Sequence, residues 1–489
     1  MHSLIYLLQS GRHFPDVPFF KKGEALSFHL SQAWVRSAAA LKQLLAQPYW
    51  SRAWIVQEIV LAQNPIVLYG KHVMPFEYFI KAQQLFNHHY TLCCAEKAWE
   101  PAKSRLDYLW WSNLERSMMC LRSIAELRST HTKARRGDTG QKLPLIRAVS
   151  TGIGSRKATD LRDLICGVLG LVLDRDMVPI AADYSLTTAQ VFARATAKMA
   201  KSEQNLPFLC LAEAAHNHKF ELSSWTPDWS CSSPFSGVPI VGNLSSACPG
   251  SNFEGELQQD LCLSVQSFKA DTIVAVGPMM QKKFSDYVPT LEKWRSIAGL
   301  PETSNTSDDA KKREDAFWST VMAGTLLTDA NSMNELENYR RICDDDMVNI
   351  REWWEELESA DESSYEGEQP IIMENFLRST AGLRKLFVTE GGRFGLGIGS
   401  PDSDSRAEIQ VGDEVHVVNR PELPLVLGRM TFGPDTATDG RYSLTAPPIQ
   451  CTHQDKPVFQ FISTTYIHGI MDGEVMKDQN ARALEGFLR

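Results

Sequence analysis

Residues 48–79 constrain the fold more than any other stretch of this 489-residue chain. Pro48 or Ser51 can begin a helix, because proline suits the first helical turn and serine suits the N-cap. Apolar side chains then occur at nearly every angle around the helix axis, which predicts a buried helix. The pattern changes to strands at 66–69 and 73–74, joined by a glycine turn and followed by another helix.

Glu58 is the unusual member of the predicted helix. A helical wheel places it between Trp54, Leu61 and Ala62, on a face that otherwise excludes water. Burying a lone carboxylate is costly, so Glu58 should be paired, protonated or open to a cleft. Arg52 lies roughly 120° away around the axis and is a poor partner on the same helix.

The length of 489 residues suggests two to four domains, and the hydrophobic fraction of 43% is that of a globular chain. The net charge of -9 disfavours general binding to nucleic acid or anionic membranes. The ten cysteines and twelve histidines show no metal-ligand spacing, which indicates reduced thiols in a cytosolic protein and no metal site. The longest apolar run, 164–173, is half of the ~20 residues that a membrane-spanning helix needs. No cofactor motif is present.

Residues 158–171 form a second informative segment. Thr159 or Asp160 can cap a helix, and Asp163 lies in its first turn, where the helix dipole favours an acid. The apolar run after it should be buried. Arg162 and Asp163 therefore fit an architectural ion pair or cap better than a catalytic pair.

Two shorter segments follow this one. Residues 183–185 are expected just before a helix that starts near Thr187 or Thr188. Residues 225–229 are interpreted as a packed aromatic corner. No nucleophile, base and acid are spaced in a way that predicts a catalytic triad. The residues of the two segments are Asp183, Tyr184 and Ser185, and then Trp225, Pro227, Asp228 and Trp229.

Residues 385–476 have the alternation typical of β-strands. Strands are expected at 387–389 and 393–398, with a turn at 411–414 feeding a strand at 415–418. The glycines of the first hairpin do not make a nucleotide loop, because neither Lys-Ser/Thr nor a helix follows them.

The last motif-like segment spans residues 466–474. Asp472 and Glu474 are cation-ligand types, but two carboxylates alone rarely make a site, so a capped turn is the better interpretation. Elsewhere the patterns predict two or three helices over 76–127 and a basic surface loop over 129–140. In the acidic segment 344–367 they predict a helix with one apolar edge followed by a mobile loop.

Several of these segments, in this order, resemble the fungal heterokaryon-incompatibility (HET) family. Residues 48–79 resemble the last motif of the HET domain. Residues 158–185 and residues 222–229 resemble two later motifs of HET proteins, and the ending resembles that of large HET proteins. The residues that carry the resemblance are Trp50, Arg52, Trp54, Gln57 and Glu58; Asp160, Arg162, Asp163, Asp183 and Tyr184; Trp225, Pro227, Asp228 and Trp229; and Gly469, Asp472, Gly473 and Glu474.

The resemblance implies an α+β protein. Mostly helical N-terminal and middle regions would surround a partial HET module, which is distantly similar to TIR domains, and the C-terminal region would be β-rich. The expected regions are 1–82 (the C-terminal part of a HET domain), 83–235 (helical), 236–378 (mixed, with an acidic helix) and 379–489 (β-rich).

The earlier HET motifs, an aromatic-Ala-Leu-Ser-Tyr-x-Trp-Gly strand and an Ile-Asp-x-x-Cys-Ile-Asn-Gln strand, do not occur in this sequence. Either the protein is short or its start lies inside a longer reading frame. Those strands would form most of the sheet on which the first predicted helix packs. We call this helix, which begins at Pro48 or Ser51 and contains Trp54, the Trp-rich helix.

The resemblance implies a cytoplasmic protein of fungal non-self recognition and programmed cell death, acting through protein partners and without a cofactor. This class predicts toxicity on overexpression in a fungal host. The likeness of HET to TIR domains gives an alternative, an NAD-cleaving hydrolase with Glu58 as the catalytic carboxylate, which predicts nicotinamide release. A third alternative, an inactive shortened paralogue, predicts neither effect.

Overall fold

The computed structural model describes residues 5, 20–22, 28–30, 32–89, 105–137, 142–153, 156–173, 180–206, 208–213, 222–231, 244–250, 253–281, 284–300, 307–327, 339–359, 377, 380–400, 408–419, 423–430, 456–478 and 482–489. The chain is an α+β protein that divides into two compact units. The N-terminal unit contains residues 1–185 and 229–232, and the C-terminal unit contains 186–228 and 233–489. These limits differ from the four regions expected from the sequence.

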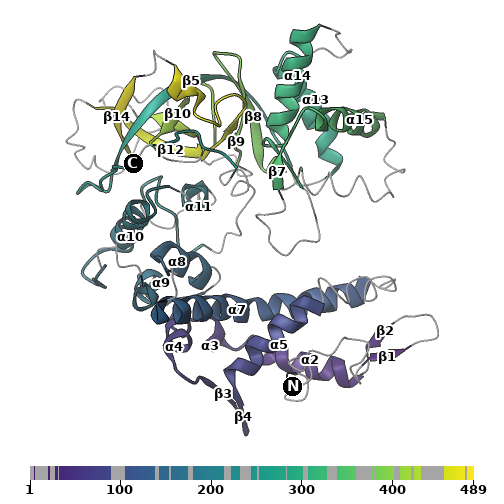
Figure 1. Ribbon diagram of the computed structural model, residues 1–489, viewed down its shortest axis with the longest axis vertical. Helices are drawn as coiled ribbons and strands as arrows, with labels where there is room; N and C mark the ends of the chain where they lie inside the picture. Colours follow the sequence, from purple (N-terminus) through teal and green to yellow (C-terminus); the bar gives the residue numbers. More distant parts are fainter. Residues whose placement is uncertain are drawn as a thin grey trace. The chain divides into compact units, whose positions relative to one another are not determined.

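The N-terminal unit is a helical bundle around one long helix, α7 (Figure 1). Helices α2, α4, α5 and α8 all contact α7. Its elements are β1 (Phe20–Lys22), β2 (Phe28–Leu30), α2 (Gln32–Leu45), α3 (Pro48–Ser51), α4 (Ile55–Leu61), β3 (Ile66–Tyr69), β4 (His72–Pro75), α5 (Phe76–His88), α7 (Arg105–Arg136), α8 (Leu145–Ile153), α9 (Asp163–Cys166) and the 3₁₀ turn η3 (Leu169–Leu171).

The long helix corrects one prediction, because α7 continues to Arg136 through most of the expected loop at 129–140. No glycine or proline interrupts this stretch before Gly137, which takes a left-handed φ of 78°. Thr130 and His131 are also buried, so this part of the helix packs against the unit despite its basic composition.

The predicted Trp-rich helix is two helices, α3 and α4, separated by residues 52–54. At the break, the Ala53 N–H donates to the carbonyl of Lys157 (2.9 Å), and the Lys157 N–H donates to the carbonyl of Ser51 (2.6 Å). This backbone pairing replaces helical hydrogen bonds, so the chain leaves the helix there.

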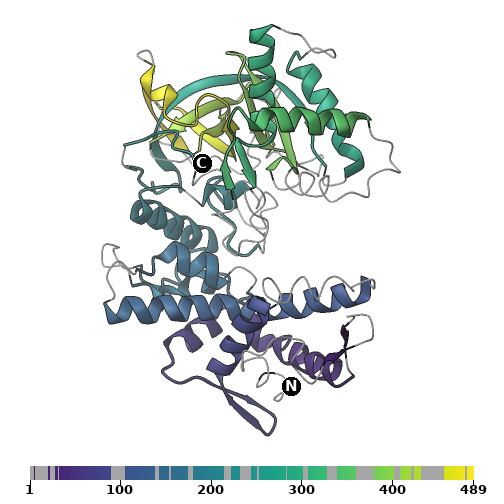
Figure 2. The ribbon, with the colours of Figure 1, turned by 45° about the vertical axis from the view of Figure 1, so that its right-hand side comes forward.

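The hairpin after α4 follows the prediction. Strands β3 and β4 pair antiparallel around Gly70, and α5 starts directly after Pro75. The hairpin projects from the helices of its unit (Figure 2). Ile66, Leu68 and Val73 are exposed on it.

The C-terminal unit combines a β-barrel with helices. Its elements are α10 (Thr188–Glu203), α11 (Leu209–Glu213), β5 (Leu263–Met279), η4 (Phe284–Asp286), α13 (Tyr287–Ile297), α14 (Asp308–Val321), β6 (Thr325–Leu327), β7 (Tyr339–Arg341), α15 (Asp346–Ser359), β8 (Arg384–Thr389), β9 (Phe394–Ile398), β10 (Glu414–Val418), β11 (Leu425–Arg429), β12 (Val458–Thr464), β13 (Tyr466–Ile467), α17 (Glu474–Lys477) and β14 (Ala483–Leu488).

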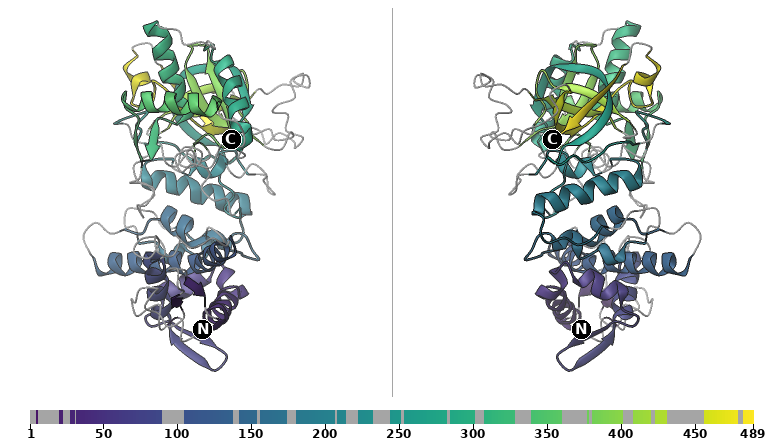
Figure 3. Two further views of the ribbon diagram at one scale, coloured as in Figure 1. Left: turned by 90° about the vertical axis from the view of Figure 1, so that its right-hand side faces the viewer. Right: turned by 90° about the vertical axis from the view of Figure 1, so that its left-hand side faces the viewer.

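Five strands close into a barrel in the order β5, β10, β11, β12, β14 and back to β5 (Figure 3). The pairings are antiparallel except that of β12 with β14. Strand β5 is 17 residues long, so its second half extends beyond the ring and pairs with β8, which leads to β9 and β13. Closure gives each barrel strand two neighbours, which protects the sheet edges.

Three helices cover the extension of the sheet. Helices α13, α14 and α15 share one hydrophobic cluster with β8 and β9, in which Trp294, Phe317 and Trp318 are fully buried. Helix α15 is the acidic helix with one apolar edge that the sequence predicts, with Ile350 and Trp354 buried. The mobile loop expected after it lies outside the described residues.

The other predicted elements of this region are confirmed. Thr187 caps α10 through a capping box with Gln190, and β8 and β9 form the hairpin expected from the sequence. The strand predicted at 415–418 lies within β10. In the described part of the chain, no helix is both long and apolar enough to cross a bilayer.

Candidate functional site

Glu58 does not lie on an apolar face, so the prediction made from the helical wheel is wrong. Both Glu58 and Leu61 are exposed, and the buried face of α4 consists of Ile55, Val56, Ile59 and Val60. Helix α4 is therefore amphipathic. Trp54, which the wheel placed beside Glu58, lies in the break at 52–54 before the helix begins. The Glu58 carboxylate accepts a hydrogen bond from the Tyr49 hydroxyl at 3.2 Å and needs no cleft.

The residues around Glu58 serve packing. Trp50 is 5% exposed and stacks on Phe76, with 6.2 Å between the ring centroids. Trp54 is half-buried, while Arg52 is exposed and contributes its backbone to the pairing with Lys157. Gln57 lies against Gly170, where an added Cβ would come within 2.6 Å of its amide nitrogen.

Sequence reasoning missed the buried arginine of this region, Arg156. It is 7% exposed, and its guanidinium donates to the carbonyls of Gly152 (2.7 Å), Trp50 (2.5 Å) and Cys120 (3.3 Å). Arg156 thereby joins α8, α3 and α7. Burial lowers the pKa of the guanidinium. No local pattern could reveal these contacts, because two of the three carbonyls are distant in sequence.

The segments at 158–171 and 183–185 meet in one cluster. Arg162 forms an ion pair with Asp160 (2.7 Å), donates to the carbonyl of Tyr184 (2.5 Å) and lies 5.2 Å from the centre of its ring. The Tyr184 hydroxyl donates to Asp163 at 2.6 Å, and Asp183 accepts from the Ser185 hydroxyl. The cluster is partly exposed, with Tyr184 46% exposed.

This cluster is an ion-pair and hydrogen-bond network, in which Arg162 pairs with Asp160 and Asp163 accepts from Tyr184. The hydrogen bond to Asp163 raises the pKa of Tyr184 well above its usual value. The hydrogen bond from Arg162 lowers the pKa of Asp160. The expected apolar helix is short here, since α9 has four residues and η3 follows, but Leu164, Ile165 and Leu171 are buried as predicted.

The aromatic segment at 225–229 is buried throughout. The Trp225 indole is fully buried and donates to the carbonyl of Leu261 at 3.1 Å within the C-terminal unit. Pro227 and Asp228 are also buried in that unit, whereas Trp229 belongs to the N-terminal one. The two tryptophans therefore belong to different units, and the packed aromatic corner stays a prediction.

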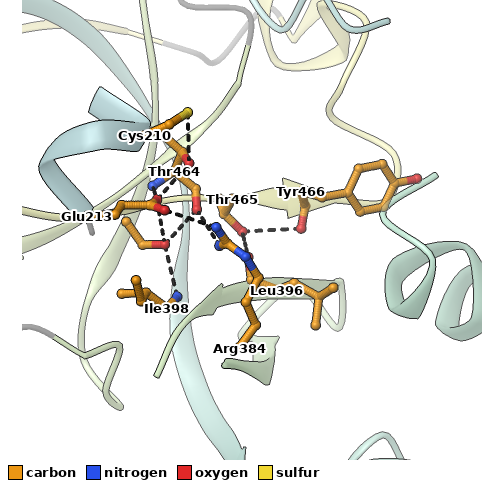
Figure 4. Close-up of polar contacts among 9 residues, drawn as sticks. Cys210, Glu213, Arg384, Leu396, Ile398, Thr464, Thr465 and Tyr466 are labelled. Carbon is orange, nitrogen blue, oxygen red and sulfur yellow. Dashed lines mark hydrogen bonds and ion pairs between the residues drawn. The ribbon is translucent and has the colours of Figure 1, made fainter. Parts of the chain in front are cut away.

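A buried ion pair joins α11 to β8, and hydrogen bonds join it to β12 of the barrel (Figure 4). Arg384 and Glu213 are 4% and 2% exposed, and their charged atoms are 2.9 Å apart. The other Glu213 oxygen accepts from the Ser463 hydroxyl (3.0 Å), the Thr464 hydroxyl (2.6 Å) and the Thr464 N–H. The sequence carried no signal for this pair, whose partners are 171 residues apart.

A second buried chain of polar groups lies within the barrel. His416 is fully buried between Ser267, whose hydroxyl is 3.0 Å from Nδ1, and Glu414, whose carboxylate is 2.9 Å from Nε2. The set has the residue types of a catalytic triad. Ser267 is only 1% exposed, so a substrate cannot reach its hydroxyl and the chain is structural.

Glu414 should make the stability of the C-terminal unit depend on pH. The hydrogen bond with His416, aided by Lys269, lowers its pKa from 4.5 to about 2. A lowered folded-state pKa stabilises the fold above the unfolded-state value, and this contribution of up to about 3 kcal/mol is lost as pH falls from 4.5 toward 2. Denaturant titrations of Glu414→Gln should therefore show a deficit at neutral pH that shrinks in acid.

The exposed residue Glu485, which is paired with Lys456 at the surface, provides the control. Glu485→Gln should cost at most about 1 kcal/mol at neutral pH. A deficit of Glu414→Gln that stays constant from neutral pH into acid would contradict the assignment.

The C-terminal motif lines a pocket of about 300 Å³ in the C-terminal unit. Its walls come from the end of α14, the β6–β7 hairpin, residues 244–245 and the segment from β13 to α17. Arg341 forms a bidentate pair with Asp472 and also donates to the carbonyl of Leu244. Glu474 accepts from the Asp472 N–H at 2.7 Å, which is the capped turn that the sequence predicts.

Gly469 and Gly473 give this turn its shape, with left-handed φ values of 86° and 79°. In the described part of the chain, no group of three or more His, Cys, Asp or Glu residues could hold a metal ion.

Comparisons with known proteins add no family to this description. No family model, no curated protein and no solved structure matches the chain.

Proposed function

We propose that the chain is a cytoplasmic signalling protein of the heterokaryon-incompatibility type, which acts in fungal non-self recognition and cell death by contacting protein partners. The proposal rests on the resemblance in motif order. The observation that carries it is the contact between the segments 158–171 and 183–185, in the cluster of Asp160, Arg162, Asp163 and Tyr184.

The composition of this cluster favours protein recognition. Arginine and tyrosine are the residue types that most often dominate binding energy in protein interfaces. Tyr184 presents nearly half of its surface, and the contacts with Arg162 and Asp163 hold it in place. A side chain that is ordered before binding loses little entropy when a partner covers it.

The test is growth of a filamentous fungus after induced expression of the full chain. We expect the wild-type chain to lower colony counts, and the double variant Arg162→Ala/Tyr184→Ala to restore them, because truncation of such interface residues weakens binding by about 1.4 kcal/mol or more, a tenfold rise in Kd. Tyr78→Ala, at another exposed tyrosine, should behave as wild type.

Equal protein levels and equal melting temperatures make these strains comparable. Growth arrest by the double variant as strong as that by wild type would contradict the role of the cluster. No arrest by any variant would favour an inactive paralogue instead.

NAD cleavage is the less favoured function. It requires the Glu58 carboxylate to lie in an apolar cleft, whereas Glu58 is exposed beside Tyr49. A solvated carboxylate gains no electrostatic advantage from a dry cleft.

A further inference from the structure

We propose that the pocket at the C-terminal motif binds a compact organic cation, a primary ammonium carried on a short apolar body. The site is independent of the partner-binding cluster proposed above. Its argument rests on the charges, polar groups and walls that face the pocket.

The charges of the lining leave one carboxylate without a counter-ion. Arg341 and Asp472 neutralise each other through a bidentate pair. Glu474 accepts one backbone N–H, from Asp472, and no cation among the described residues pairs with it. The pocket therefore presents a net charge of one negative unit, which favours a cation over an anion.

The other polar groups are neutral and available. Tyr466, His468 and Ser319 also line the pocket, and the Tyr466 hydroxyl, the His468 ring and the Ser319 hydroxyl make no hydrogen bond to another described residue. Burial lowers the pKa of His468, an effect that Glu474 and Asp315 oppose. A neutral imidazole does not repel a bound cation and offers both a donor and an acceptor.

Backbone geometry fixes the position of Tyr466. An added Cβ on Gly324, which has a left-handed φ of 67°, would come within 2.5 Å of the tyrosine ring. Any larger residue there would displace the ring. Figure 4 shows the Tyr466 side chain directed away from the Glu213–Arg384 pair.

Apolar residues make up much of the remaining lining, beside Ser245 and Thr325. Ala323, Ile342 and Met471 line the pocket, and Ala323 and Met471 belong to one buried cluster. Ligand sites commonly combine such walls with a few polar groups that fix orientation. The volume is at the lower end of the range for such sites, which favours a compact ligand.

Three probes of equal size test the charge preference of the purified full chain. They are phenethylammonium, 2-phenylethanol and phenylacetate, measured by calorimetry up to about 20 mM, where Kd values in the millimolar range are resolved. We expect phenethylammonium to bind at least about tenfold more tightly than the alcohol, the equivalent of about 1.4 kcal/mol, and phenylacetate to bind least.

Glu474→Gln keeps an oxygen for the Asp472 N–H but removes the charge. It should weaken phenethylammonium at least about tenfold and leave the alcohol unchanged, whereas Glu485→Gln should change neither. Tyr466→Phe should weaken phenethylammonium without loss of melting temperature.

Each other outcome would overturn the proposal. Equal binding of the three probes would mean an apolar pocket without charge preference, and tightest binding of phenylacetate would mean an anion site at Arg341. No binding of any probe, with the wild-type chain folded, would mean that the pocket is not a site of this kind.

Discussion

Replacing Arg384 by methionine is expected to destabilise the C-terminal unit by about 3–5 kcal/mol, because it leaves the Glu213 carboxylate buried without a cation. Methionine keeps much of the volume of the arginine, so the loss reports charge rather than a cavity. Denaturant titration should give the free energy, and hydrogen exchange of the peptide containing β12 should locate it in the C-terminal unit.

Two controls separate the buried charge from other effects. Glu213→Leu combined with Arg384→Met removes both charges and should recover most of the loss, since an apolar pair often replaces a buried ion pair without penalty. Lys456→Met breaks an exposed pair on the same sheet and should cost at most about 1 kcal/mol. If Arg384→Met costs no more than Lys456→Met, the buried pair does not stabilise this unit.

Replacing Arg156 by methionine is expected to cost the N-terminal unit about 3 kcal/mol. The change removes the donor of the Trp50 and Gly152 carbonyls, whereas the Cys120 carbonyl keeps the Ser123 hydroxyl, and an unsatisfied buried carbonyl costs about 1–3 kcal/mol unless water reaches it. Hydrogen exchange should rise in peptides of α3, α7 and α8.

The matched control is Arg52→Met, at an exposed arginine of the same segment, with an expected effect within about 0.5 kcal/mol. Arg156→Lys keeps the charge but not the planar fork, so it should recover only part of the loss. Faster exchange in β12 rather than in α3 would contradict the assignment of Arg156 to the N-terminal unit.

Local sequence rules predicted the parts of the fold that short-range chemistry decides. The hairpin around Gly70 and the start of α10 next to Thr187 depend on neighbours within a few residues, and both are confirmed. The C-terminal turn with Asp472 and Glu474 is confirmed for the same reason.

The features that the sequence did not predict depend on contacts between residues far apart in the chain. Pairing with Lys157 breaks the Trp-rich helix and gives α4 a wet face that includes Glu58, whereas a wheel drawn from one continuous helix places Glu58 in the core. Closure of the barrel depends on β5 pairing with strands more than 140 residues away, such as its Cα partner pair Thr272 and Glu414. The pocket was missed because only one of its walls, the C-terminal turn, has a recognisable motif.

The most direct test of the account is the NAD content of the fungal cells during induced expression of the chain. If the protein signals through partner contacts and Glu58 is only a solvated surface residue, NAD should stay at its uninduced level while growth stops, in wild type and in Glu58→Gln alike. A fall in NAD with the wild-type chain that Glu58→Gln abolishes would contradict the account and identify the protein as an NAD-cleaving enzyme.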